Sequence, residues 1–213
     1  MTTILHLSAL YAEEGWHPAG ARSLDFTSLE GTACYCSPEA EAALREGLRP
    51  VGHSGLCWID TGDYHYLSKL RMESVGEPFA LVLLDNHPDD QPGAFGDALL
   101  SCGSWVKNAL EGLGMLKKSF WNTLPGYCGL PVFLSIDLDV LSREYARTDW
   151  DQGSMTLPRL LDIISAIRTE HRILGVDICG GITAAKGATA EDLLVNTRTR
   201  AVLEELIGGT GAG

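Results

Sequence analysis

The sequence predicts an α/β fold with three layers (αβα), in which helices cover both faces of a mostly parallel central sheet. The first observation is that short apolar runs alternate with helical stretches along the chain, a pattern typical of such sheets. The second is that the runs are continuously apolar, as in strands buried on both faces. The third is the length of 213 residues, which suits a single domain over residues 1–213.

The apolar runs are the strand candidates. In chain order they are Thr3 to Leu7, Leu56 to Asp60, Phe79 to Asp85, Val132 to Asp137 and Ile173 to Ile178. The stretch from Leu113 to Leu130 contains several glycines, a proline and scattered apolar residues, so we expect loop and short strand there.

The helix candidates lie between and after these runs. They are Pro38 to Leu48, Tyr66 to Ser74, Ser104 to Leu113, Leu157 to Thr169 and Ala190 to Leu206. The fourth has the clearest bounds, because Thr156 supplies a capping hydroxyl, Pro158 lies in the first turn, and the helix ends near His171, where a cation suits a helix C-terminus. The glycine-rich residues 208–213 are expected to form a flexible tail.

Charge and composition exclude several classes of function. The formal net charge of −12 argues against a nucleic-acid or anionic-membrane partner, since those surfaces require Lys and Arg. No apolar run approaches the roughly 20 residues of a membrane span. The first residues lack an export signal, so we expect a cytoplasmic location and mostly free cysteines. Cys34 and Cys36 have no second pair at zinc-finger spacing, so we expect no structural zinc site.

Two acidic clusters each follow a strand candidate, and together they predict a metal site. The first is Asp85-Asn-His87-Pro-Asp89 and the second is Asp137-Leu-Asp139. Residues i and i+2 of an extended chain point to one face, so the members of each cluster can converge. Open α/β sheets hold their ligands at the carboxyl edge of the strands. We therefore expect both clusters at the same rim.

A third segment, Asp60 to Tyr66, also lies just past a strand candidate and contains His65. A lone histidine is more often structural, but its place at a third strand end makes His65 a candidate sixth ligand. Carboxylates and imidazoles suit two hard-to-borderline divalent cations and do not suit thiolate-rich zinc chemistry. Manganese is the natural candidate.

These three segments resemble the metal-binding motifs of the arginase/agmatinase (ureohydrolase) superfamily. That family carries Gly-Gly-Asp-His, Asp-X-His-X-Asp and Ser-X-Asp-X-Asp in this order at strand ends. Here the second and third motifs match at every ligand, and the first has one inserted residue, Tyr64. Acidic residues at strand ends often only cap helices or solvate loops, but four aspartates and two histidines in family order make that interpretation weaker. The resemblance implies an arginase/deacetylase-like fold and the homo-oligomers usual in the family.

The resemblance also implies a ligand set for two manganese ions. One ion would bind His65, Asp85, Asp89 and Asp137, and the other Asp85, His87, Asp137 and Asp139. Asp85 and Asp137 would bridge, because two close cations repel unless anionic ligands lie between them. The ions would activate a water molecule as the nucleophile, and Asp89 would orient it.

Two positions depart from the family pattern. The segment Leu100 to Trp105 lacks the family's proton-donating histidine, so Cys102 is the candidate catalytic proton donor, although a buried packing thiol is an equal alternative. Gly180 stands where arginases carry a glutamate that binds the guanidinium. Asp177 and Asn86 are therefore the candidate substrate-binding residues. The segment between the two acidic clusters is shorter than in arginases, which suggests a more open entrance to the site.

Of three possible functions, the first is the leading hypothesis: a dinuclear manganese hydrolase that cleaves a C–N bond of a guanidino or amidine group and releases urea from a small-molecule or peptide-borne arginine-like group. The second is a related metal-dependent amidohydrolase or deacetylase, for which one ion suffices. The third is a non-catalytic, metal-stabilised binding protein, which the missing histidine and glutamate favour.

Overall fold

The computed structural model describes residues 1–93, 99–126 and 128–208. Its centre is a seven-stranded sheet with the strand order β2-β1-β3-β7-β6-β4-β5, and each neighbouring pair runs parallel. The expectation of a mostly parallel sheet is therefore confirmed. The strands are β1 (Thr2–His6), β2 (Arg22–Asp25), β3 (Leu56–Ile59), β4 (Phe79–Leu84), β5 (Leu116–Trp121), β6 (Val132–Asp137) and β7 (Ile173–Cys179).

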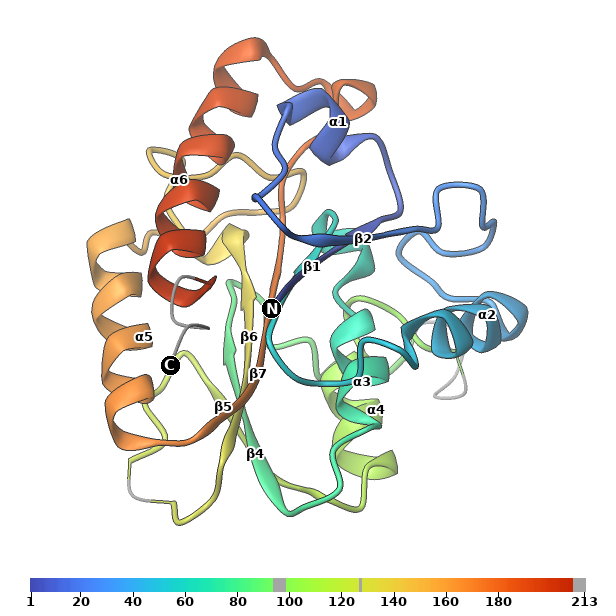
Figure 1. The fold of residues 1–213 in the computed structure, drawn as a ribbon, viewed down its shortest axis with the longest axis vertical. Coiled ribbons are helices and arrows are strands. Elements are labelled where there is room, and N and C mark those ends of the chain that lie inside the picture. The colour runs from blue at the N-terminus through green and yellow to red at the C-terminus, as the bar shows by residue number, and fades with distance from the viewer. Residues whose placement is uncertain (94–98, 127, 209–213) are drawn as a thin grey trace.

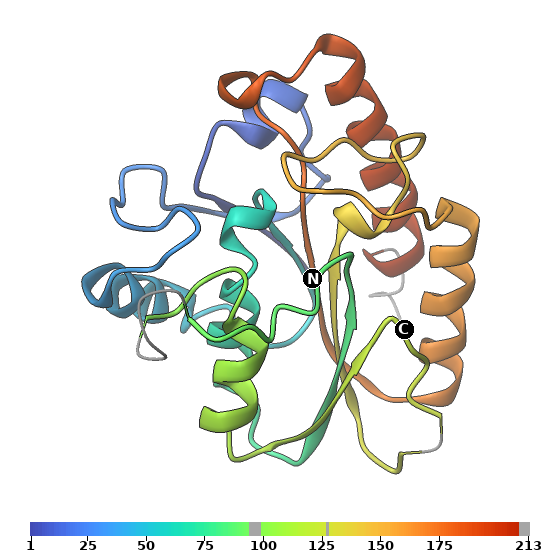
Figure 2. The ribbon, with the colours of Figure 1, turned by 180° about the vertical axis from the view of Figure 1, so that it is seen from behind.

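Helices cover both faces of the sheet, as Figures 1 and 2 show from opposite sides. One face packs against α1, α5 and α6, and the other packs against α2, α3 and α4. This is the three-layer arrangement that the sequence predicts. In the described part of the chain, no helix is long and apolar enough to cross a membrane. The helices are α1 (Leu10–Glu14), α2 (Pro38–Leu48), α3 (Leu67–Met72), α4 (Trp105–Gly112), α5 (Leu157–Glu170) and α6 (Ala190–Gly208), with short 3₁₀ turns η1 (Gly62–Tyr64), η2 (Leu138–Val140) and η3 (Ala184–Lys186).

The central strands are apolar throughout because their side chains alternate between two cores. All six residues of β4 are buried, and so are all six of β6. Leu81 and Leu83 of β4 pack beneath α2, α3 and α4, whereas Val82 and Leu84 pack beneath α5 and α6. Continuous apolar runs of this kind need a helical layer on each side.

The observed bounds of the predicted strands and helices differ from the predicted bounds by at most two residues. α2 begins where predicted, and Ser37 Oγ caps it by accepting a hydrogen bond from the Ala40 amide at 3.1 Å. At the start of α5, Thr156 Oγ1 accepts a hydrogen bond from the Arg159 amide at 3.4 Å. Of the expected flexible tail, Gly208 ends α6, and residues 209–213 lie outside the described part.

Three short elements were not predicted as such. β2 alternates between half-buried and exposed residues and pairs only with β1, and α1 has five residues. β5 lies inside the stretch assigned to loop and short strand, and its Lys117 and Lys118 are exposed. Short edge elements such as these depend on tertiary pairing, which local propensity does not reveal.

The topology opens a crevice at the carboxyl edge of the sheet. β4 and β6 are neighbours, but the chain leaves β4 toward α4 on one face and leaves β6 toward α5 on the other. β3 and β7 diverge in the same way, toward α3 and α6. Loops that part to opposite faces leave the space between them free, which is where ligands bind in open α/β sheets.

Asp177 lies below this crevice and does not reach it. Its side chain is fully buried on β7 and forms an ion pair with Arg71 of α3. Arg71 also donates hydrogen bonds to the carbonyls of Gly52 and Ser54, each at 3.1 Å. The structure therefore corrects the assignment of Asp177 to substrate binding: this carboxylate joins α3 to the sheet.

We expect the substitution Asp177→Asn to lower the free energy of unfolding by about 3–5 kcal/mol, because it leaves a buried guanidinium without its counter-charge. Urea denaturation would measure the change. The matched control is Glu77→Gln, whose partner Arg172 is exposed, and which should cost at most about 1 kcal/mol. A loss from Asp177→Asn no larger than that of the control would contradict this role.

Candidate metal centre

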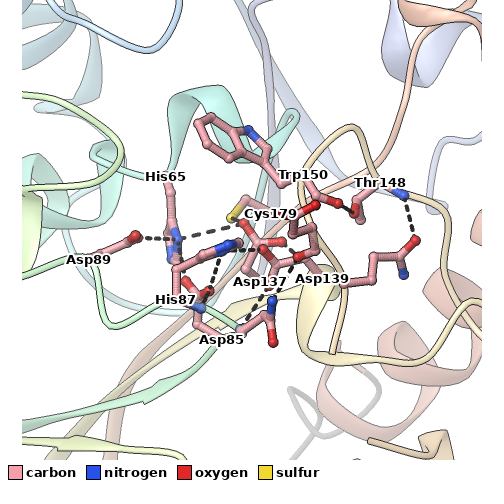
Figure 3. A network of polar contacts seen from close by, with 12 residues as sticks. His65, Asp85, His87, Asp89, Asp137, Asp139, Thr148, Trp150 and Cys179 are labelled. Carbon is pink, nitrogen blue, oxygen red and sulfur yellow. Dashed lines mark hydrogen bonds and ion pairs between the residues drawn. The ribbon is translucent and has the colours of Figure 1, made fainter. Parts of the chain in front are cut away.

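Six side chains converge in a pocket of about 170 Å³ at the carboxyl edge of the sheet. His65 follows η1, the first acidic cluster follows β4, and the second lies at the end of β6 and in η2. All six predicted ligands line the pocket, together with Gly62, Gln91, Cys102, Gly103 and Trp150. The six side chains therefore lie together at one edge of the sheet, as expected (Figure 3).

His65 is held so that one ring nitrogen faces the carboxylates. Its Nε2 is hydrogen bonded to Ser135 Oγ at 2.8 Å. Its Nδ1 lies 3.1 Å from Asp85 Oδ2 and 3.1 Å from Asp89 Oδ2, and 3.7 Å from Asp137 Oδ2. Among the residues that the structure describes, none forms a hydrogen bond of acceptable geometry with this buried Nδ1. At metal sites, a hydrogen bond to one ring nitrogen of a histidine usually fixes the ring so that the other nitrogen can coordinate the ion.

His87 forms a second group with Asp139. Its Nδ1 lies 2.8 Å from Asp139 Oδ2 and 3.6 Å from Asp85 Oδ1. The His87 amide also donates a hydrogen bond to Asp85 Oδ1 at 2.6 Å. Asp85 thus presents Oδ2 to the His65 group and Oδ1 to the His87 group, which is the arrangement that a bridging carboxylate requires.

The donor atoms fit divalent cations. The described part of the chain contains three groups of ligand-type residues, and within each group the donor atoms lie within 4.8 Å of one another. The groups are His65 with Asp85 and Asp89, Asp85 with His87 and Asp139, and His65 with Asp137 and Cys179. Ligands about 2.1 Å from a metal ion are separated from each other by roughly 3 Å, and several of the observed spacings are close to this. A donor set of carboxylate oxygens and imidazole nitrogens suits manganese better than it suits metals that prefer thiolate ligands.

The pKa values of the acidic residues in the pocket also favour the binding of cations. Burial, together with the negative charge of Asp85, raises the pKa of Asp137 to about 6. Burial and the charge of Asp137 raise the pKa of Asp139 to about 8. Hydrogen bonds to Asp139 and Asp85 raise the pKa of His87 to about 10. Without metal, the cluster therefore retains protons that divalent ions would displace on binding.

Two supporting residues were missed because they belong to no motif. Trp105 donates its indole Nε1–H to Asp89 Oδ2 at 2.6 Å, and Asp89 has a left-handed backbone with φ of 50°. The Cys179 thiol donates to Asp137 Oδ2 at 3.0 Å, and burial raises the pKa of Cys179 well above its usual value, so it stays protonated. Both orient ligand carboxylates from outside the motifs.

Cys102 and Asn86 have different positions relative to the pocket. Cys102 lines it, so its assignment as proton donor stays a prediction. Burial raises the pKa of this thiol. The Asn86 side chain instead donates Nδ2–H to the carbonyl of Asp151 at 2.9 Å. This contact holds the loop after η2. Asn86 is half-buried beside the pocket, and its assignment to substrate binding stays a prediction.

The backbone of Gly180 leaves no room for a glutamate side chain at the position where arginases carry one. The φ angle of Gly180 is +102°, a backbone conformation that residues with a side chain rarely adopt. A β-carbon at this position would lie 2.6 Å from Asp137 Oδ1. The backbone approaches the ligand too closely for any side chain.

Comparison with known proteins shows the fold. No family model matches the sequence. An uncharacterised protein of Thermotoga maritima is 29% identical over 196 residues, which cover 83% of this chain and 78% of that protein. Formimidoylglutamase from Bacillus subtilis has a TM-score of 0.67 at 12% identity, over 98% of this chain and 86% of that chain.

Two further solved structures agree. Proclavaminate amidino hydrolase from Streptomyces clavuligerus has a TM-score of 0.67 at 13% identity, over 96% of this chain and 89% of that chain. Arginase from Bacillus subtilis has a TM-score of 0.62 at 11% identity, over 98% of both chains. The likeness extends over nearly the whole chain and identifies the three-layer fold as arginase-like.

We expect Trp105→Phe to weaken Mn²⁺ binding about tenfold or more, because Asp89 loses the donor that fixes its orientation. Isothermal titration of metal-free protein with MnCl₂ would measure the affinity. The control is Trp58→Phe, which removes an equivalent hydrogen bond to Glu204, 2.7 Å long and outside the pocket. Equal Mn²⁺ affinity in both variants would show that Trp105 does not position the ligand.

Proposed function

We propose that this chain, whose fold is arginase-like, is a dinuclear manganese-dependent hydrolase that cleaves a C–N bond of a guanidino or amidine group. The specific reaction is release of urea from an arginine-like group. The observation that carries the proposal is that Asp85 faces the His65 group with Oδ2 and the His87 group with Oδ1. One carboxylate shared between two donor groups supports two neighbouring cations.

When bound, two divalent ions would lower the pKa of a water molecule toward neutrality and stabilise negative charge that develops at the substrate. His65, Asp85, Asp89 and Asp137 would hold one ion, and Asp85, His87, Asp137 and Asp139 the other. Ser135 keeps the His65 ring turned toward the carboxylates. The protein groups thus set the place of the reaction before substrate arrives.

Asp89 and Cys102 have separate tasks in this proposal. Asp89 would orient the attacking water by accepting a hydrogen bond from it, and Trp105 fixes the position of the Asp89 carboxylate. Cys102 lies in the pocket wall and keeps its proton at neutral pH because burial raises its pKa. A protonated thiol at this place can deliver a proton to the leaving nitrogen.

The substrate class rests on the shape of the pocket and on the structural neighbours. Gly180 carries no side chain over the site, and Trp150 in the pocket wall is 40% exposed. An open wall of this kind supports a bulky guanidino compound or an arginine side chain in a peptide as well as free arginine. The names of the neighbours, an amidino hydrolase, a formimidoylglutamase and an arginase, support an amidine-type carbon as the point of attack.

We expect manganese-loaded protein to release urea from free arginine, from an arginine-containing peptide blocked at both ends, or from both. Asp89→Asn should lower the rate at least about 100-fold, because the water loses its acceptor. A colorimetric urea assay would measure it, with Asp162→Asn on the exposed face of α5 as the control.

Absence of urea from both substrates would contradict this reaction. If manganese nevertheless raised the melting temperature and no other C–N substrate were hydrolysed, the chain would be a non-catalytic metal-binding protein. The lack of a side chain at Gly180 and of a histidine between Leu100 and Trp105 is the observation that favours this second candidate.

We expect His65→Ala to reduce bound manganese from two ions per chain to one, because the group of Asp85, His87 and Asp139 stays complete. Electron paramagnetic resonance of free Mn²⁺ would count the bound ions, and His17→Ala, a histidine outside the pocket, is the control. Deacetylase-like chemistry uses a single ion and no His65 ligand. Equal metal content in His65→Ala and wild type would therefore support the deacetylase alternative.

A further inference from the structure

Two of the six cysteines face each other beside the metal pocket. Cys34 lies in the loop before α2, and Cys102 lies in the loop before α4. Tyr35 and Ser101 form an isolated antiparallel bridge, so Cys34 and Cys102, the next residues along the two segments, stand opposite each other. The Cys102 amide donates a hydrogen bond to the Cys34 carbonyl at 2.9 Å. Both cysteines are free thiols in this structure.

The spacing of Cys34 and Cys102 suits a disulfide. Opposite residues of an antiparallel pair that share such a hydrogen bond have Cα atoms about 5.5 Å apart and side chains on the same face. Disulfides join residues whose Cα atoms are roughly 4.4–6.8 Å apart. The two thiol groups are also hydrogen-bonding partners of each other. An S–S bond can therefore form without a large movement of the backbone.

The position of the Cys34 sulfur is fixed by its surroundings. The φ angle of Cys34 is 59°, in the left-handed region that residues with a side chain rarely adopt. The Cys34 amide donates to the carbonyl of Asp63 at 3.2 Å, and the thiol donates to Asp63 Oδ1 at 3.1 Å. An unfavourable backbone conformation of this kind persists where several contacts enforce it, and such positions gather at functional sites.

Both thiols are within reach of a small oxidant but react slowly without one. Cys34 is half-buried, and Cys102 lines the metal pocket. Burial and the hydrogen bond to Asp63 raise the pKa of Cys34 to about 11, and burial raises the pKa of Cys102. Because the thiolate is the reactive form, we expect the pair to stay reduced at neutral pH until an oxidant is present.

We propose that Cys34 and Cys102 are a redox-active pair, which a two-electron oxidant such as a peroxide converts to a disulfide that stops hydrolysis at the metal centre. Each thiol loses its hydrogen and the two sulfur atoms form one S–S bond. The oxidant takes up two electrons and two protons, so that hydrogen peroxide becomes two molecules of water. A small thiol reverses the reaction by thiol–disulfide exchange.

The disulfide would change the wall of the pocket and leave the candidate metal ligands in place. It removes the Cys102 proton, which the proposed function delivers to the leaving nitrogen, and it removes the thiol donor from Asp63 Oδ1. Among the residues that the structure describes, neither cysteine belongs to a group of metal-type donors, so we expect the manganese content to stay the same. The loss of hydrolysis rests on the proposed function, whereas formation of the disulfide does not.

Peptide mapping by mass spectrometry tests the pair directly. Manganese-loaded protein would be treated with diamide, a compound that takes one hydrogen from each of two thiols. The remaining thiols would then be alkylated and the protein digested without reductant. We expect a cross-linked peptide that joins Cys34 to Cys102 and that disappears when dithiothreitol is added before digestion. Absence of this peptide would overturn the proposal.

Urea release measures the consequence of the disulfide. Diamide should lower the rate of the wild-type protein at least about tenfold, because the proton donor is lost, and dithiothreitol should restore it. Cys34→Ser keeps a donor for Asp63 and should be active before and after diamide. The control is Cys128→Ser, which removes another half-buried thiol, bonded to the Leu130 carbonyl at 3.7 Å, and which should respond as the wild type does.

The outcomes separate this inference from the proposed function. Equal inactivation of Cys34→Ser and wild type by diamide, or full activity of cross-linked wild type, would overturn the redox control. Wild-type protein that forms the cross-linked peptide but releases no urea when reduced would overturn the proposed function and leave the disulfide standing.

Discussion

The concentration of buried negative charge at one edge of the sheet is the constraint on which the rest of the site depends. Asp85, Asp89, Asp137 and Asp139 are each no more than 8% exposed, and they face one another across a small pocket. Carboxylates so placed repel unless protons or cations lie between them. Divalent cations neutralise them and leave the carboxylates ionised as ligands, which protons do not.

The surrounding contacts hold this charge in place. Ser135, Trp105 and Cys179 each form a hydrogen bond to a predicted ligand, and they come from β6, α4 and β7. The parallel sheet makes this possible, because its four central strands end at the same edge while their loops diverge to opposite faces. The fold therefore supplies both the crevice and the rigid frame around it.

The sequence predicted the central strands, the main helices and the six converging side chains, because those features are local. Continuous apolar runs and the spacing of Asp85, His87 and Asp89 are visible in a few consecutive residues. The role of Trp105 was not visible, since it depends on a contact between α4 and the loop after β4. Asp177 was misassigned because alternation places it on the same face as Cys179 but one repeat, roughly 6–7 Å, deeper in the sheet. There it faces Arg71, which no local pattern reveals.

The candidate ligands and the neighbouring wall of the pocket come from different parts of the chain. The candidate ligands follow strand ends, whereas Gly180 and Trp150 lie beside them on other segments. The departures from the arginase motif concern the second set.

Elemental mass spectrometry of protein purified without chelator is the most direct test of the dinuclear centre. We expect two divalent ions per chain, chiefly manganese, and a large fall in melting temperature when a chelator removes them. Protein that contains no divalent metal, takes none up from MnCl₂ and melts at the same temperature with and without chelator would contradict it.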